Sequence, residues 1–147
     1  MAFKGSSVHT INESGRISIP SKMREQLKSA YGEEELVLVT RGKYVAAYPS
    51  RELDDYFAKL RAKSGAKAKQ AMREINETLA ETAVDKQGRI LIPPKLRELA
   101  GLTGECKIIG MYDRIEIWDN ARYEQDMGRD YDDGDDDIDD LLNDLMF

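Results

Sequence analysis

The sequence predicts an α+β protein assembled from two copies of one β-α-β unit. The first observation is an internal repeat, since residues 12–25 (NESGRISIPSKMRE) and 85–98 (DKQGRILIPPKLRE) align without a gap and agree at 8 of 14 positions. The second is that strand and helix signals follow the same order around each copy. The third is a helical pattern between the copies, which separates them along the chain. Self-similarity of this kind indicates a duplicated supersecondary unit.

The first copy begins with two short strands joined by a tight turn. Residues 5–11 alternate weakly and predict a strand, and residues 12–15 predict a turn because Asn and Gly tolerate a positive φ. Isoleucines at alternate positions of residues 16–19 predict a second strand with one buried face. Pro20 ends this strand, and Ser21 is expected to cap a helix that continues to about residue 30.

A β-hairpin completes the first copy, and the second copy repeats the order. After Gly32, which ends the helix, the apolar runs 36–39 and 44–48 flank a polar turn at residues 41–43. The second helix is expected from Pro94, a residue that suits the first helical turn, to about residue 99. The strands predicted for the second copy are 82–84, 89–92, 107–111 and 115–118.

Two apolar stripes predict a helical connector between the copies. Leucine and aromatic residues from Leu53 to Leu60 recur at i, i+3, i+4 and i+7, and a second stripe runs from Ala68 to Leu79. Ser64-Gly65 is expected to break the helix between them. The connector also carries many bases, which indicate either a solvated helix face or a basic rim or subunit contact. They are Lys59, Arg61, Lys63, Lys67, Lys69 and Arg73.

The charge of the chain is divided unevenly between its body and its C-terminal tail. The whole chain has a net charge of −6, but residues 129–147 hold nine aspartates and one arginine, a net of −8. Residues 1–128 therefore hold 21 bases and 19 acids, a net of +2. Because attraction depends on local patches, the overall acidity does not exclude a nucleic-acid partner. The tail is too charged to bury a core and is expected to be disordered.

Few residues are suited to catalysis or to metal binding. His9 is the only histidine and has no evident Ser or Cys partner, and Cys106 is the only cysteine, so neither a zinc site nor an internal disulfide is expected. The Asp-rich tail lacks the rigid scaffold that acid–base catalysis needs, and no phosphate loop is present. Neither a membrane span nor a secretory leader is expected, and a lone thiol fits a reducing cytoplasm. We therefore expect a cytoplasmic protein that is not an enzyme and uses no cofactor or metal.

The repeated Asx-x-x-Gly-Arg turn is the best candidate for a binding site. Gly15 and Gly88 permit a sharp turn, and Arg16 and Arg89 begin strands whose next residue points inward. Alternation then places both arginines outward beside the turns. Two exposed guanidiniums on rigid strands suit phosphate binding or bidentate recognition of guanine. An alternative is that Asp85 pairs with Arg89 and only fixes its own turn, a role that is compatible with DNA contact.

These residues resemble a known family. Two copies of a Gly-Arg-Ile-x-Ile-Pro strand followed by a Lys-x-Arg-Glu helix are similar to MraZ, a family of bacterial transcriptional regulators built from two AbrB-type (SpoVT–AbrB) DNA-binding modules. The resemblance covers about residues 1–126. The family's Asp-x-x-x-Arg motif falls on Asp85 and Arg89, and in the first copy on Asn12 and Arg16. The DNA-binding residues that this implies are Asn12, Gly15, Arg16, Asp85, Lys86, Gly88 and Arg89.

The resemblance also implies an architecture. We expect tandem AbrB-type modules that form one intertwined, pseudo-two-fold β-barrel, assembled into a ring-shaped homo-oligomer. The modules are expected at residues 5–49 and 82–128, the second with a C-terminal helix. Residues 50–81 would be the helical connector and residues 129–147 the acidic tail.

Two functions remain open at this point. The resemblance implies a sequence-specific, nucleoid-associated repressor that binds double-stranded DNA at short repeated operator sites upstream of the division and cell-wall gene cluster. The alternative is an antitoxin-like protein-interaction module that binds a partner protein through its acidic tail, because AbrB-type folds also occur in antitoxins. The presence of the arginine turn in both copies favours DNA binding.

Overall fold

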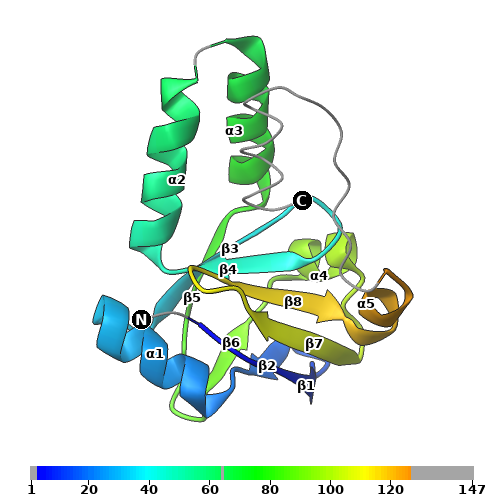
Figure 1. Ribbon diagram of the computed structural model, residues 1–147. Helices are drawn as coiled ribbons and strands as arrows, with labels where there is room; N and C mark the ends of the chain where they lie inside the picture. Colours follow the sequence, from blue (N-terminus) through cyan, green and yellow to red (C-terminus); the bar gives the residue numbers. More distant parts are fainter. Residues whose placement is uncertain (1–2, 64, 127–147) are drawn as a thin grey trace.

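The computed structural model describes residues 3–63 and 65–126 (Figure 1). The expected order of strands and helices is confirmed in both copies. The acidic tail, residues 129–147, for which disorder was expected, lies outside the described residues. The described elements are β1 (Ser6–Thr10), β2 (Arg16–Ser18), α1 (Ser21–Tyr31), β3 (Glu35–Thr40), β4 (Val45–Tyr48), α2 (Ser50–Ala62), α3 (Ala66–Thr78), β5 (Ala80–Ala83), β6 (Arg89–Leu91), α4 (Pro94–Ala100), β7 (Glu105–Gly110), β8 (Ile115–Asp119) and α5 (Asn120–Asp126).

The α+β class is confirmed, but the strands do not close into one β-barrel. Six strands form an antiparallel sheet in the order β1-β7-β8-β4-β3-β5, whose edges β1 and β5 do not pair with each other. In the described part of the chain, β2 and β6 form a separate two-stranded ladder. Pro20 and Pro93 follow these two strands closely, and proline has no backbone N–H to extend a ladder. Proline therefore limits the length of the β2–β6 ladder.

The strand pairing is unchanged when the two copies are exchanged. Replacing β1–β4 by β5–β8 converts the pair β3–β5 into β7–β1, and the pair β3–β4 into β7–β8. The pairs β4–β8 and β2–β6 map onto themselves, centred on Ala46–Glu116 and on Ile17–Ile90. Both copies thus contribute strands to the same sheet and to the same ladder.

The six-stranded sheet separates two apolar clusters. One face packs on the β2–β6 ladder, α1 and α4, through residues such as Leu38 and Ile17. The other face is covered by α2, α3 and α5, through residues such as Val39, Leu60 and Trp118. Figure 1 shows the resulting layers, with the α2–α3 hairpin above the sheet and the ladder below it. The hairpin and the ladder therefore lie on opposite sides of the sheet.

The helix boundaries follow from glycine and proline. Gly32 adopts a left-handed conformation after α1, and Gly65, at φ 125°, precedes α3 where the connector was expected to break. Ser21 is not the helix cap that the sequence predicted. Pro20 occupies the cap position of α1 and makes no side-chain hydrogen bond there, which moves Ser21 to the first helical residue. None of the described helices is long and apolar enough to cross a bilayer.

Candidate nucleic-acid interface

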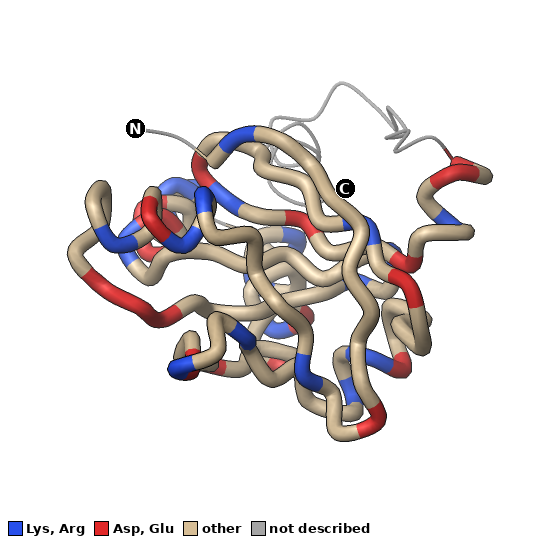
Figure 2. Tube along the Cα trace, turned by 90° about the horizontal axis from the view of Figure 1, so that it is seen from below, with Lys and Arg blue, Asp and Glu red and all other residues tan. Residues whose placement is uncertain are grey.

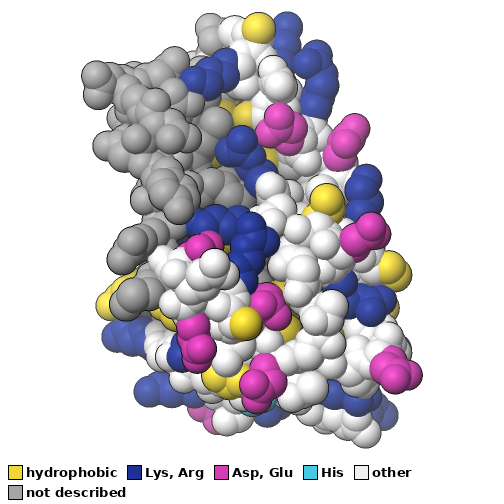
Figure 3. Space-filling model, turned by 90° about the vertical axis from the view of Figure 1, so that its right-hand side faces the viewer, with side chains coloured by type: hydrophobic (Ala, Val, Ile, Leu, Met, Phe, Trp, Pro, Cys, Tyr) yellow, Lys and Arg dark blue, Asp and Glu magenta, His cyan; other side chains and the backbone are white. Residues whose placement is uncertain are grey.

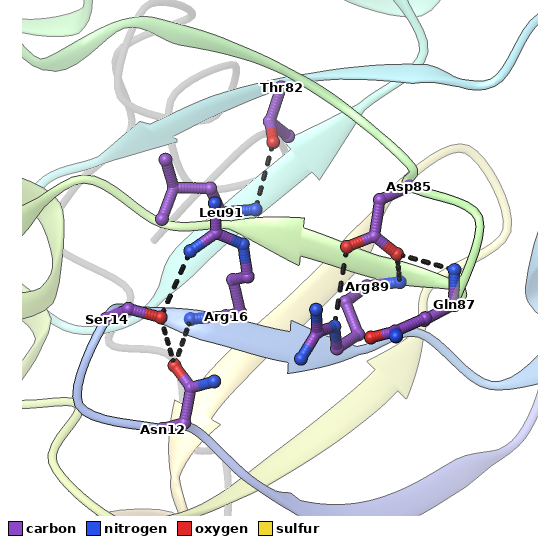
Figure 4. A network of polar contacts seen from close by, with 8 residues as sticks. All are labelled: Asn12, Ser14, Arg16, Thr82, Asp85, Gln87, Arg89 and Leu91. Carbon is purple, nitrogen blue, oxygen red and sulfur yellow. Dashed lines mark hydrogen bonds and ion pairs between the residues drawn. The ribbon is translucent and has the colours of Figure 1, made fainter.

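Two arginines share the outer face of the β2–β6 ladder. Arg16 pairs with Leu91 and Arg89 pairs with Ser18, and the isoleucines between them are each 1% exposed. Because side chains alternate along a strand, burial of the isoleucines directs both arginines to the opposite face. Figure 4 shows the two arginine side chains on the same side of the ladder. They are diagonal neighbours, a relationship that places residues roughly 7–8 Å apart.

The first turn, residues 12–15, is held by neutral side chains. The backbone N–H of Gly15 donates to Asn12 O at 2.9 Å. Asn12 Oδ1 accepts from the backbone N–H of Arg16 at 2.9 Å and from Ser14 Oγ at 2.8 Å. The Arg16 guanidinium donates from Nη1 to Ser14 Oγ at 3.1 Å (Figure 4). Asn12 and Ser14 therefore connect the turn to the Arg16 guanidinium through neutral side chains.

The second turn, residues 85–88, has the same geometry with a carboxylate in it. Asp85 Oδ1 accepts from the backbone N–H groups of Gln87 at 2.8 Å and Arg89 at 2.9 Å. Asp85 Oδ2 lies 3.4 Å from Arg89 Nε, so the expected pairing of these two residues is present. The hydrogen bond from the Arg89 backbone, helped by the Gln87 N–H and the Arg89 charge, lowers the pKa of Asp85. The two turns are thus alike in shape and different in charge.

Each turn also packs against an arginine from the helix of the other copy. Arg97 of α4 donates from Nε to Ile92 O at 2.9 Å and from Nη1 to Glu13 O at 3.4 Å. A Cβ on Gly15 would lie 2.7 Å from Ile92 O and 2.8 Å from Arg97 Nε. Gly15 also has φ 91°. This position therefore requires glycine for its backbone conformation and for its space.

The second turn repeats this exchanged packing. Arg24 of α1 donates from Nε to Ile19 O at 3.0 Å, and a Cβ on Gly88 would lie 2.6 Å from Arg24 Cζ. The backbone N–H of Ile19 donates to Gly88 O at 2.9 Å. The sequence analysis did not select Arg24 or Arg97. Their signal was present, because both belong to the Lys-x-Arg-Glu part of the repeat.

The tips of the turns differ in charge as well. Lys86 is exposed in the second turn, whereas its counterpart in the first turn is the exposed Glu13. Figure 2, which views the Cα trace from the ladder side, shows positions of Lys and Arg interspersed along the chain with positions of Asp and Glu. Binding at this face would depend on individually positioned arginines more than on bulk charge.

The surroundings of His9 and Cys106 are defined by the structure. His9 does have a hydroxyl partner that the sequence analysis missed, because Ser7 Oγ lies 2.9 Å from His9 Nε2 along the edge strand β1. Cys106 is fully buried, and burial raises the pKa of its thiol to about 11. Within residues 3–63 and 65–126, no group of three His, Cys, Asp or Glu side chains is placed to hold a metal ion.

Comparisons with known proteins cover almost the whole chain. A family model described as "MraZ protein, putative antitoxin-like" matches residues 2–75 and 79–134. Three of the similar proteins are each described as "Transcriptional regulator MraZ". The protein from Syntrophotalea carbinolica is 36% identical over 84% of this chain and 85% of its own. The protein from Lachnoclostridium phytofermentans is 39% identical over 83% and 84%. The protein from Corynebacterium jeikeium is 35% identical over 92% and 96%.

Proposed function

The chain belongs to the MraZ family, and on that premise we propose that it is a transcriptional regulator that binds double-stranded DNA through the outer face of the β2–β6 ladder. The observation that carries the proposal is the diagonal placement of Arg16 and Arg89 on one face, each beside a fixed glycine turn. The relatives are described as regulators, a class that is not an enzyme class. The DNA-contacting set would be Asn12, Gly15, Arg16, Asp85, Lys86, Gly88 and Arg89.

The shape of the ladder supports this mode of binding. The major groove of B-DNA is about 12 Å wide and admits a two-stranded β-ribbon. On such a ribbon, Arg16 and Arg89 would reach guanine edges or phosphates in bidentate fashion. The Asx side chains act as positioning groups, because they fix the backbone N–H of each arginine. Lys86 adds a phosphate contact at one end only, since Glu13 occupies the equivalent place at the other.

The proposal extends to the assembly. The modules 5–49 and 82–128, joined by the connector 50–81, would act as one pseudo-two-fold body, and several bodies would form a ring. The exchange relationship in the strand pairing supports the pseudo-symmetry. A single ladder makes few contacts, so linking several ladders would raise the effective concentration on an array of sites. The expected sites are short operator repeats upstream of the division and cell-wall genes, where the protein would act as a nucleoid-associated repressor.

A binding titration tests the proposal directly. The full-length protein is titrated with DNA from its own upstream region, in parallel with Arg16→Ala, Arg89→Ala and the control Arg61→Ala. Arg61 is exposed on α2, on the opposite side of the sheet from the ladder. Loss of either ladder arginine is expected to cost about 1–3 kcal/mol per occupied site, and the control should bind like the wild type. Unchanged affinity for both ladder variants would refute the proposal.

A second candidate function is an antitoxin-like protein-interaction module. Two observations favour it, the "antitoxin-like" description of the matching family and the nine aspartates of residues 129–147. If a partner protein binds through the tail, replacing the tail aspartates by asparagine should abolish that binding, and Arg16→Ala should leave it unchanged. DNA binding through the ladder has the opposite dependence, so the two functions are distinguishable with the same variants.

A further inference from the structure

The α2–α3 hairpin carries a concentration of positive charge at its loop end. Residues 56–73 contain six bases and no acid, whereas acids occur on both sides of this segment at Asp55 and Glu74. Figure 3 shows dark blue side chains at the upper end of the molecule, with magenta only below them. The six bases of this loop end are Lys59, Arg61, Lys63, Lys67, Lys69 and Arg73.

Helix stability accounts for only part of this pattern. Lys59 and Arg61 lie in the last turn of α2, where the end of a helix favours positive charge, but the bases of α3 have no such role. Lys67 and Lys69 lie in the first turn of α3, which contains no acid, although the start of a helix favours negative charge. Lys69 and Arg73 are at i, i+4, where like charges weaken a helix. A polyanion at the loop end would offset both effects, so the charge pattern suits an acidic partner.

The position of the loop end argues against a DNA duplex as that partner. α2 and α3 have 13 residues each, so the hairpin is about 20 Å long. It extends from the face of the sheet opposite to the β2–β6 ladder (Figure 1). A duplex seated on Arg16 and Arg89 would therefore lie beyond the sheet and could not contact the loop end of the same subunit.

We propose that the loop end of the α2–α3 hairpin is a docking site for the Asp-rich C-terminal segment of this chain, residues 130–147. This segment holds nine aspartates and no base, which complements six bases with no acid. The 21 residues after Asp126 can extend up to about 70 Å, enough to reach any part of the body. Tethering keeps the effective concentration of the segment high. The proposal rests on charge and reach, and does not depend on the proposed DNA contacts.

Docking at this site has a consequence for DNA binding. A free polyanion near the ladder would compete with DNA phosphates for Arg16, Arg89 and Lys86. Held at the loop end, the same segment lies across the sheet from the ladder. The tail would then have little influence on DNA affinity, and its attachment would weaken with salt because exposed charges are screened.

Zero-length carbodiimide coupling on the full-length chain tests the location. The reagent joins carboxylates to lysines in contact, and peptide mass spectrometry reads the links. Tail links to lysines of the loop end, such as Lys69 at the start of α3, are expected to exceed links to Lys22, Lys86 and Lys95 by several-fold. They should disappear near 1 M salt, where the screening length is about 3 Å. Dominant links to Lys22, Lys86 or Lys95, or an even spread, would overturn the proposal.

Two matched variants separate the hairpin from the ladder. Arg61→Gln with Arg73→Gln removes two charges from the loop end and leaves its lysines available for coupling, so the tail links should fall. Arg16→Gln with Arg89→Gln removes two charges from the ladder and should leave the links unchanged. The reverse result would place the tail on the ladder. Circular dichroism checks that both variants keep their helix content.

A DNA-binding measurement tests whether the loop end binds DNA instead of the C-terminal segment. The affinity of the Arg61→Gln, Arg73→Gln variant for a random duplex at low salt is expected to match the wild type. A several-fold loss would assign the loop end to DNA and overturn the proposal. Failure of the ladder variants to affect operator binding would count against the proposed function alone, because the coupling links do not depend on it.

Discussion

The Arg97 side chain of α4 lies directly against Gly15 of the first turn, 82 residues away in the sequence, so that a Cβ on Gly15 would lie 2.8 Å from Arg97 Nε. The equivalent contact joins Arg24 of α1 to Gly88. Each candidate DNA-contacting turn is therefore packed against an arginine side chain from the helix of the other copy. Substitutions at the glycines should disturb the turns through contacts as well as through backbone conformation.

The two glycines are expected to differ in how they tolerate alanine. All three close contacts of a Cβ at Gly88 are with the Arg24 side chain, which can move, whereas a Cβ at Gly15 also meets the Ile92 carbonyl at 2.7 Å. Both substitutions should destabilise the fold, by about 1–3 kcal/mol from overpacking in addition to strain at positive φ. Arg24→Ala should recover part of the loss in Gly88→Ala, whereas Arg97→Ala should recover less in Gly15→Ala. Double-mutant cycles from chemical denaturation measure both.

Gly32→Ala is the control for these glycines. Gly32 has φ 68° and no atom within 4 Å of an added Cβ, so it reports backbone strain alone. If Gly15→Ala and Gly88→Ala cost no more than Gly32→Ala, the arginine contacts do not restrict the turns.

Asp85→Asn should increase the affinity for non-specific DNA. The amide oxygen of Asn can accept the same backbone hydrogen bonds, as Asn12 does from Arg16, while the ion pair with Arg89 is removed. Arg89 would then be freer to contact phosphate, and the salt slope of binding should steepen by about one counterion. Asn12→Asp is the reciprocal change and should have the opposite effect. Equal salt slopes for wild type and both variants would contradict this role of the carboxylate.

The pH dependence of the second turn follows from the lowered pKa of Asp85. A carboxyl whose pKa is lowered in the folded state contributes stability above its ordinary pKa of 3.8 and loses it as the pH falls through the lowered value. The turn should therefore be indifferent to pH between 6 and 8. Urea denaturation of wild type and Asp85→Asn should show a stability difference that is constant near neutrality and narrows only in strong acid. A difference that changes between pH 6 and 8 would point to another titrating group.

Cys106 should react with thiol reagents only after the sheet opens. Its side chain is fully buried in β7, and burial raises the pKa of the thiol to about 11, so little thiolate exists near neutral pH. Alkylation of the folded protein at pH 8 is expected to be slow and to accelerate in denaturant in step with unfolding. Rapid labelling without denaturant would mean that the β1–β7 edge opens readily. The reaction thus serves as a probe of global stability in all the variants above.

Local features of the fold could be predicted from the sequence, and long-range ones could not. Alternating isoleucines predicted β2 and β6, and Gly65 predicted the break between α2 and α3. The open sheet with a separate ladder was not predicted, because which strands pair depends on contacts between distant residues. The Ser21 cap failed because Pro20 occupies that position. The arrangement of each turn could be predicted because it depends on residues only four apart. In the second turn, for example, the backbone N–H of Arg89 donates a hydrogen bond to Asp85 Oδ1.

The candidate site shows the same division. The outward placement of Arg16 and Arg89 depends on alternation, which is visible in the sequence. The packing of Arg97 beneath Gly15 depends on the exchange of helices between copies, which no local pattern encodes. Arg24 and Arg97 occupy the same position in the two copies of the repeat, which shows that they are equivalent. The repeat does not indicate that each arginine packs against the turn of the other copy.

Joining the two copies in one chain allows the two turns to evolve separately. In an assembly of identical chains, a substitution in one turn would appear in both, and the ladder would read the same from either end. Here Asn12 of the first turn occupies the position that Asp85 occupies in the second, and Glu13 occupies the position of Lys86. The two ends of the ladder therefore carry different side chains. A DNA site that matches the ladder should be directional, and operator repeats should function in one orientation.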